Sequence, residues 1–170
     1  MRYDVIETPI GPLLVAADEA GLRRICFPER GAARRPEAGW TRDPAPFRPL
    51  AGQLAEYFAG KRHGFSLELA PRGTEFQLAT WRALARIPYG TTISYAELAR
   101  RVGRPAASRA VGAANGANPL PIVVPCHRVI GADGSLTGYG GGLPRKTALL
   151  DLEAGKRALG PAAVPHPKKT

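Results

Sequence analysis

The tripeptide Pro71-Arg72-Gly73 divides this 170-residue chain into two segments with different residue patterns. Before it, short apolar runs are separated by turn residues, a pattern typical of strands. After it, apolar residues recur at helical spacing between residues that start and stop helices. The change predicts an α+β fold with an N-terminal domain over residues 1–70 and a C-terminal domain over residues 71–155.

The N-terminal domain is expected to contain a small antiparallel sheet. Strands are predicted over residues 3–7, 13–16 and 22–27, with a turn between each strand and the next. Cys26 lies in the third strand, where it is expected to be a small core residue, with a reactive thiol as the alternative. A loop rich in Pro, Gly and Arg follows over residues 28–46.

One helix is expected to complete this domain. Its apolar residues recur at helical spacing, and they are Leu50, Leu54, Tyr57 and Phe58. The helix should stop at Gly60, because glycine is favoured just after helix ends. Residues 66–69 are a candidate for one further strand.

Two capping boxes mark helix starts in the C-terminal domain. Thr74 with Gln77 opens a helix that should end at Pro88, and Ser94 with Glu97 opens a short second helix. In a capping box the first side chain bonds to the backbone of the residue three positions later, whose own side chain returns the hydrogen bond. The C-terminal domain is therefore expected to be mostly helical.

The second and third helices of this domain form a candidate helix-turn-helix, of the winged-helix type. The short helix stops at Gly103, and Pro105 suits the first position of the next helix, which runs to Asn115. Only Arg109 in that helix is long and charged, and its small neighbours allow close approach to a shallow groove. The alternative is an Ala-rich core helix with a solvated arginine.

Charge makes the C-terminal domain a candidate for binding a polyanion. The chain has 24 Lys and Arg against 14 Asp and Glu, for a net charge of +10. Residues 71–155 hold 10 basic and 5 acidic side chains, whereas residues 1–70 hold 10 and 9. Such a surface suits DNA, because neutralised phosphates release counterions. Codon bias is the alternative, since 19 of the 24 basic residues are Arg.

Other features of the sequence bear on the cellular setting. A run of about 18 apolar residues is missing, so no membrane association is expected. Two cysteines are too few for a disulfide framework or a Cys-rich zinc site. We expect a monomeric cytoplasmic protein whose Pro- and Lys-rich end, residues 156–170, is a disordered basic tail.

The segment over residues 121–130 is chemically the most informative. Apolar residues flank Cys126 and His127, which predicts a buried strand that Pro125 interrupts, so that the thiol is held at a fixed turn. A thiol must become a thiolate to attack, and His127 is a candidate base. Neighbouring side chains on a strand point to opposite faces, so contact requires a turn or a bridging water. Glu153 could orient His127. The alternative is a buried cysteine beside a surface histidine.

This segment resembles the active-site signature of the O6-alkylguanine-DNA alkyltransferases, also called methylated-DNA-protein-cysteine methyltransferases. The resembling motifs occur in order along the chain, and they are Ser94-Tyr95, Arg109-Ala110-Val111-Gly112, Asn118-Pro119, Pro125-Cys126-His127-Arg128-Val129-Ile130, Gly138-Tyr139 and Leu149 to Glu153. The similarity covers about residues 73–155 and extends more loosely to residues 8–13.

The resemblance implies direct DNA repair in a single turnover. Cys126 would accept the alkyl group irreversibly, while His127 and Glu153 activate it through a water. Asn118 would brace the turn that holds the cysteine. The implied partner is double-stranded DNA that contains O6-alkylguanine, with O4-alkylthymine as a further candidate.

The resemblance also assigns contacts to DNA. An alkyl group on guanine is inaccessible within the base stack, so the nucleotide must rotate out. Arg109 matches the intercalating arginine of the family, and Ala110, Ala113 and Ala114 would lie in the minor groove. Tyr95 matches the residue that helps to swing the nucleotide out and contacts its phosphate.

The base pocket and the absence of a metal are implied in the same way. Tyr139, Gly138 and Val129 would line the pocket that receives the base. Some relatives bind a structural zinc through Cys and His in the N-terminal domain, where this chain offers only Cys26 and His63. We therefore expect no metal and no cofactor.

Two other classes of function are alternatives. The first is an alkyltransferase-like protein that binds damaged DNA without transfer, but such relatives replace the acceptor cysteine. The second is a thiol hydrolase that uses Cys126 and His127, which would explain neither the helix-turn-helix nor the basic half.

Overall fold

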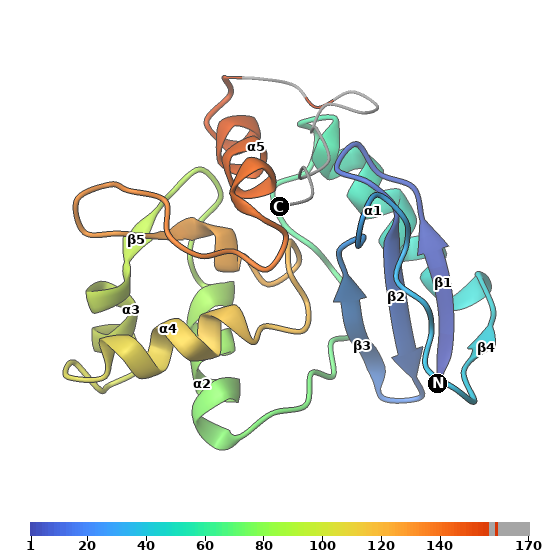
Figure 1. The fold of residues 1–170 in the computed structure, drawn as a ribbon, viewed down its shortest axis with the longest axis horizontal. Coiled ribbons are helices and arrows are strands. Elements are labelled where there is room, and N and C mark those ends of the chain that lie inside the picture. The colour runs from blue at the N-terminus through green and yellow to red at the C-terminus, as the bar shows by residue number, and fades with distance from the viewer. Residues whose placement is uncertain (157–158, 160–170) are drawn as a thin grey trace.

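The computed structural model describes residues 1–156 and 159, and it places a small sheet beside a mainly helical half (Figure 1). The strands of the sheet are β1 (Arg2–Ile6), β2 (Leu13–Asp18), β3 (Gly21–Cys26) and β4 (Thr41–Arg42). Their order is β3-β2-β1-β4, and the first three strands pair antiparallel as predicted. The two-residue strand β4 pairs parallel with β1 and was not predicted.

Helix α1 (Arg48–Phe58) packs on the sheet after a 3-10 turn, η1 (Ala45–Phe47). It buries the apolar face that the spacing predicts, and the chain leaves the helix at Gly60, whose φ is 75°. Figure 1 shows α1 behind the strands. The sheet and this helix together form the expected N-terminal half.

The further strand expected over residues 66–69 is wrong. Only an isolated bridge joins Leu69 to Leu22 of β3. Farther along the same strand edge, the backbone N–H of Ile25 donates instead to the carbonyl of Pro119, at 2.9 Å. The C-terminal half therefore occupies the strand edge that a fourth antiparallel strand would need.

The C-terminal half is built from four helices and a pair of very short strands, as far as residue 156. The helices are α2 (Glu75–Ala85), α3 (Tyr95–Arg101), α4 (Ser108–Gly116) and α5 (Leu143–Glu153). The remaining elements are β5 (Ile93–Ser94), the 3-10 turn η2 (Cys126–Arg128) and β6 (Val129–Ile130), which pairs parallel with β5. Helices α3 and α4 form the predicted pair around Gly103, whose φ is 82°.

The helix starts differ in detail from the expectation. Thr74 and Gln77 form the complete capping box, whereas Ser94 only accepts from the backbone of Glu97. The carboxylate of Glu97 binds Arg100 and Arg101 instead of returning the hydrogen bond. Helix α4 starts at Ser108 rather than at Pro105, because a separate turn at residues 105–106 intervenes, closed by the bond from Ala107 N to Arg104 O.

One apolar core extends across both halves. Its buried members include Leu13, Val15, Tyr57, Leu84, Leu98, Val129 and Leu149. Leu159 is also buried in this core. Residues 157–158 and 160–170 of the expected disordered tail lie outside the described part, so the tail stays a prediction. Domain boundaries at residues 70 and 155 remain predictions.

None of the helices in the described part of the chain is both long enough and apolar enough to cross a membrane.

Replacing Thr74 with Ala should lower the free energy of unfolding by about 1 kcal/mol, because the cap of α2 is lost. Chemical denaturation measures the difference. The control Thr92→Ala, at an exposed position outside the helices, should change it by less than about 0.5 kcal/mol. Equal values for the two variants would contradict the importance of the capping box.

Candidate active site

Cys126 lies on a turn rather than on a strand. Residues 121–124 form turns, η2 follows, and the chain becomes extended only in β6. The expected turn at the thiol is confirmed, whereas the expected strand is wrong except at residues 129–130. The strand is missing before the cysteine because the φ of Ile122 is 74°, which is incompatible with a strand and redirects the chain.

The side chain of Asn118 braces this turn. Its Nδ2 donates to the carbonyl of Val124 at 2.8 Å, and its Oδ1 accepts from the backbone N–H of Leu120 at 3.0 Å. A second amide, Asn115 at the end of α4, donates to the carbonyl of Cys126 at 3.4 Å. The position of the cysteine is thus fixed by two side-chain amides, which bind the carbonyls of the residues before and after Pro125.

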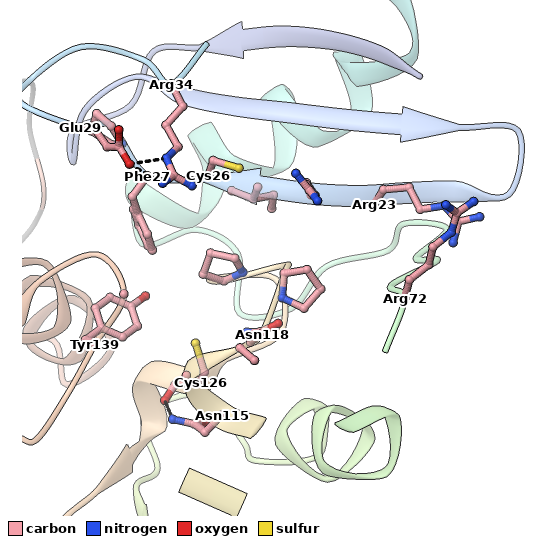
Figure 2. A pocket seen from close by; sticks show the side chains of 18 of the residues that line it. Arg23, Cys26, Phe27, Glu29, Arg34, Arg72, Asn115, Asn118, Cys126 and Tyr139 are labelled. Carbon is pink, nitrogen blue, oxygen red and sulfur yellow. Dashed lines mark hydrogen bonds and ion pairs between the residues drawn. The ribbon is translucent and has the colours of Figure 1, made fainter. Parts of the chain in front are cut away.

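A cavity of about 700 Å³ lies between the two halves, and Cys126 lines it. Figure 2 shows Cys126, Asn118 and Tyr139 on one side and, on the other, Cys26 at the end of β3 and Phe27 just after it. Cys126 is only 5% exposed. Cys26 is half-buried and faces this cavity, so its expected place in the core is wrong. The reason is the alternation of side chains along β3: Ile25 faces the core, so its neighbour Cys26 points to the opposite face.

Two of the three residues expected in the base pocket line the cavity. They are Gly138 and Tyr139, whose ring packs edge-on against Phe27 with centroids 5.5 Å apart. The Tyr139 hydroxyl is buried and has no hydrogen-bond partner within the described residues. The expectation that Val129 lines the pocket is wrong. Its side chain is fully buried in the core, and its carbonyl accepts from Nζ of Lys146.

The carboxylate of Glu153, at the end of α5, gathers three side chains that we call the Glu153 cluster. Its Oε1 accepts from the hydroxyl of Tyr57 at 2.7 Å and from Nε2 of His127 at 2.8 Å. The guanidinium of Arg128 donates to both carboxylate oxygens, each at 2.8 Å. Burial acts to raise the pKa of Glu153, but the hydrogen bonds from His127 and Arg128 outweigh it and hold that pKa well below its ordinary value.

His127 has the protonation state required of a base. It is fully buried, and this burial lowers its pKa despite the opposing effect of Glu153. Since a carboxylate only accepts, Nε2 carries the proton toward Glu153 and Nδ1 keeps a free lone pair. Nothing in residues 1–156 and 159 bonds to Nδ1. The expected pairing of Glu153 with His127 is present.

The thiol of Cys126 is protonated at rest. Burial raises its pKa to about 11, outweighing a hydrogen bond from Asn118 and the positive charge of Lys146. A protonated thiol is a poor nucleophile, so attack requires a base at the moment of reaction. The arrangement therefore suits a thiol that reacts only when a substrate is positioned beside it.

Three residues of the site were missed by the sequence reasoning. Tyr57 was predicted only as part of an apolar helix face, and nothing in that pattern indicates the contact of its hydroxyl. Arg128 was quoted in the motif without a role. Lys146 is fully buried, and its Nζ donates to the carbonyls of Val129 and Thr137 at 2.7 and 3.0 Å. Its helical spacing from Glu153 could have indicated a shared inner face.

Helix α4 presents most of the residues expected to meet DNA. Arg109, Ala110 and Ala113 are exposed on it. The expectation that Ala114 meets DNA is wrong. Its side chain is 3% exposed and packs inward, and its carbonyl accepts from Nε1 of Trp81 at 2.8 Å. The helix is thus partly core and partly surface, and its surface is formed by small residues around one arginine.

Tyr95 lies at the start of α3, between α4 and the loop over residues 131–142, which contains Tyr139 and which we call the cavity loop. Its ring lies beside Gly112, where an added Cβ would be 3.7 Å from it. Its hydroxyl donates to the carbonyl of Thr137 at 3.3 Å. The structure therefore brings Tyr95 and the cavity loop together, although they are 42 residues apart.

The basic surface of the C-terminal half is smaller than the charge count suggests. Its exposed arginines are Arg72, Arg82, Arg86, Arg100, Arg101, Arg104 and Arg109. Arg128, Arg145 and Lys146 are buried instead, and Arg145 donates to the carbonyls of Ile10 and Gly141. Three of the ten cations therefore serve internal contacts.

The described residues contain no group of three or more His, Cys, Asp or Glu side chains placed to hold a metal ion. His63, one of the two zinc candidates considered, stacks on Tyr89 with ring centroids 3.9 Å apart.

Two family models match the chain. The ribonuclease-like domain of 6-O-methylguanine DNA methyltransferase matches residues 1–71, and the DNA-binding domain matches residues 75–155. Among curated proteins, the methylated-DNA–protein-cysteine methyltransferases of Methanosarcina barkeri and Mycobacterium tuberculosis are each 51% identical over 153 residues. That is 90% of this chain and 97% and 92% of those proteins.

The fold agrees with the sequence match. The crystal structure of Mycobacterium tuberculosis OGT in complex with DNA is 49% identical, with a TM-score of 0.86 over 95% of this chain and 96% of that one. The two family models together span almost the whole chain, and the relatives have about the same length. The chain belongs to the 6-O-methylguanine DNA methyltransferase family.

Proposed function

We propose that this protein binds duplex DNA, takes up O6-alkylguanine and transfers the alkyl group irreversibly to Cys126. The observation that carries the proposal is a cavity-facing thiol beside a neutral histidine that is held by a buried carboxylate. The family and its named methyltransferases supply the reaction class. The acceptor is part of the protein, so each molecule acts once.

The site can perform this transfer with its own residues. The Sγ proton of Cys126 moves through a bridging water to Nδ1 of His127, and the resulting charge on the imidazole is stabilised by Glu153. The sulfur attacks the alkyl carbon as the C–O6 bond breaks. The electron pair of that bond remains on the guanine, to which His127 returns the proton. The product is a thioether and an unmodified guanine.

Tyr139 would act on the bound base, and Asn118 acts on the turn that holds the sulfur of Cys126. The Tyr139 hydroxyl faces the cavity, and burial raises its pKa well above the ordinary value, so it remains a proton-bearing donor. It would donate to the bound base, while the two hydrogen bonds of Asn118 hold the turn and hence the sulfur. The cavity would thus fix the alkyl carbon relative to Sγ.

Helix α4 is the element proposed to enter the minor groove. Its exposed small residues allow close approach, and Arg109 would fill the gap in the stack after the nucleotide rotates out. Tyr95, beside the cavity loop, would contact the phosphate of that nucleotide. Ala110 and Ala113 would lie in the minor groove, whereas the buried Ala114 would not.

A monomer in a reducing compartment fits these features. Every side chain of the proposed mechanism comes from one chain, and both cysteines are free thiols, as in cytoplasmic proteins. An alkyltransferase-like protein without transfer is disfavoured, because the acceptor thiol is present.

Cys126→Ser should stop transfer while leaving the affinity for DNA nearly unchanged, because a hydroxyl is a far weaker nucleophile near neutral pH. Transfer of a labelled methyl group from an oligonucleotide to protein measures the first property, and a binding titration measures the second. The matched control Cys26→Ser should transfer normally. Undiminished transfer by Cys126→Ser would refute the mechanism.

Arg109→Ala should slow repair of duplex DNA at least about tenfold more than reaction with a free O6-alkylguanine base, because only the duplex requires base flipping. Single-turnover rates on the two substrates measure the ratio. Arg104→Ala removes an equal charge from the turn before α4 and should not separate the two substrates. Equal losses on both substrates for Arg109→Ala would contradict the gap-filling role.

A further inference from the structure

The N-terminal half contributes one polar side chain to the Glu153 cluster. Tyr57 on α1 is fully buried and lies 96 residues before Glu153 in the chain. Its hydroxyl bond to Oε1, at 2.7 Å, is as short as the bonds from His127 and Arg128 to the same oxygen. The remaining side-chain donors to this carboxylate come from the C-terminal half.

We propose that Tyr57 is a positioning residue for alkyl transfer, because its hydroxyl fixes the carboxylate oxygen that orients His127. The inference rests on the proposed function and extends it. It makes the N-terminal half part of the reaction rather than only a support for the other half. The sequence motifs, which all lie between residues 73 and 155 apart from a loose match at 8–13, give no sign of this.

The surroundings of Tyr57 keep its hydroxyl a hydrogen-bond donor to Glu153. Its ring is packed against Phe58, Phe65 and Tyr89, with centroids 5.3, 5.5 and 6.2 Å away. Burial, with the nearby charge of Glu153, raises the pKa of Tyr57 well above its ordinary value. The hydroxyl therefore stays protonated and donates to the carboxylate across the physiological pH range.

Loss of this donor should change both the geometry and the basicity of the pair. Oε1 would keep only His127 and Arg128, so the carboxylate could rotate and the imidazole would be held less firmly. A carboxylate with one donor fewer also attracts the His127 proton more strongly. The pKa of His127 should therefore rise.

The other charged groups around His127 remain in place when only this hydroxyl is removed. They are Glu153 and Lys146 of α5 and Arg128 of η2. Tyr89, Tyr139 and Arg128 are the titratable neighbours of Tyr57 besides Glu153. A change in the pH profile can thus be assigned to the bond between Tyr57 and Glu153.

The test is Tyr57→Phe, which keeps the ring and removes the hydroxyl. In single-turnover transfer from a methylated duplex oligonucleotide, the rate constant should fall about tenfold, as is typical for residues that orient a catalytic group through a hydrogen bond. The acid limb of the pH–rate profile should move to higher pH. The burst amplitude, which counts competent molecules, should stay at one alkyl group per protein.

Tyr3→Phe is the matched control, because Tyr3 lies on β1 and makes none of the side-chain hydrogen bonds to Glu153. It should leave the rate, the pH profile and the amplitude unchanged. A rate and a pH profile for Tyr57→Phe equal to those of the wild type would overturn the proposal. So would a reduced amplitude with an unchanged rate, since that result indicates loss of folded protein only.

A second readout separates this inference from the proposed function. Iodoacetamide alkylates a thiolate without DNA, with iodide as the leaving group, and peptide mass spectrometry follows its reaction at Cys126 alone. Tyr57→Phe should slow this reaction and move its acid limb in the same direction. If the wild type transferred nothing from DNA, the proposed function would fail, yet this slower reaction would still support Tyr57 as a positioning residue.

Discussion

The buried carboxylate of Glu153 is the interaction on which the site depends. A charge in this position is tolerated only because side chains from α1 and η2 donate to both of its oxygens. Removing one partner from a buried charge is usually strongly destabilising, so the cluster constrains each element that contributes to it. The same contacts give His127 its orientation and leave Nδ1 free. Stability and chemistry thus rest on one set of hydrogen bonds.

The cavity lies where the two halves meet, and several contacts fix that meeting. The N–H of Ile25 in β3 donates to the carbonyl of Pro119, next to the residue that braces the cysteine turn. Arg145 joins the carbonyl of Ile10 to that of Gly141 in the cavity loop, where an added Cβ would lie 2.9 Å from Phe27. The sheet therefore determines the shape of the space in front of the thiol.

Much of the fold and part of the site could be predicted from the sequence, for reasons that differ by residue. Strands and helices follow from periodicity and caps, and the pairing of His127 with Glu153 followed from chemistry and from the motif. The turn at Ile122 could not be predicted, since its positive φ is imposed by tertiary contacts on a residue that favours strands. The inward face of Ala114 and the hydroxyl contact of Tyr57 depend on which elements pack together, which periodicity does not specify.

The central claim is that the protein itself is the alkyl acceptor. The most direct measurement is the mass of the intact protein after incubation with an excess of duplex oligonucleotide containing O6-methylguanine, followed by peptide mapping. We expect the mass to rise by one methyl group and no more, with the group on Cys126. A methyl group on Cys26, or several guanines repaired by each unmodified protein molecule, would contradict the account.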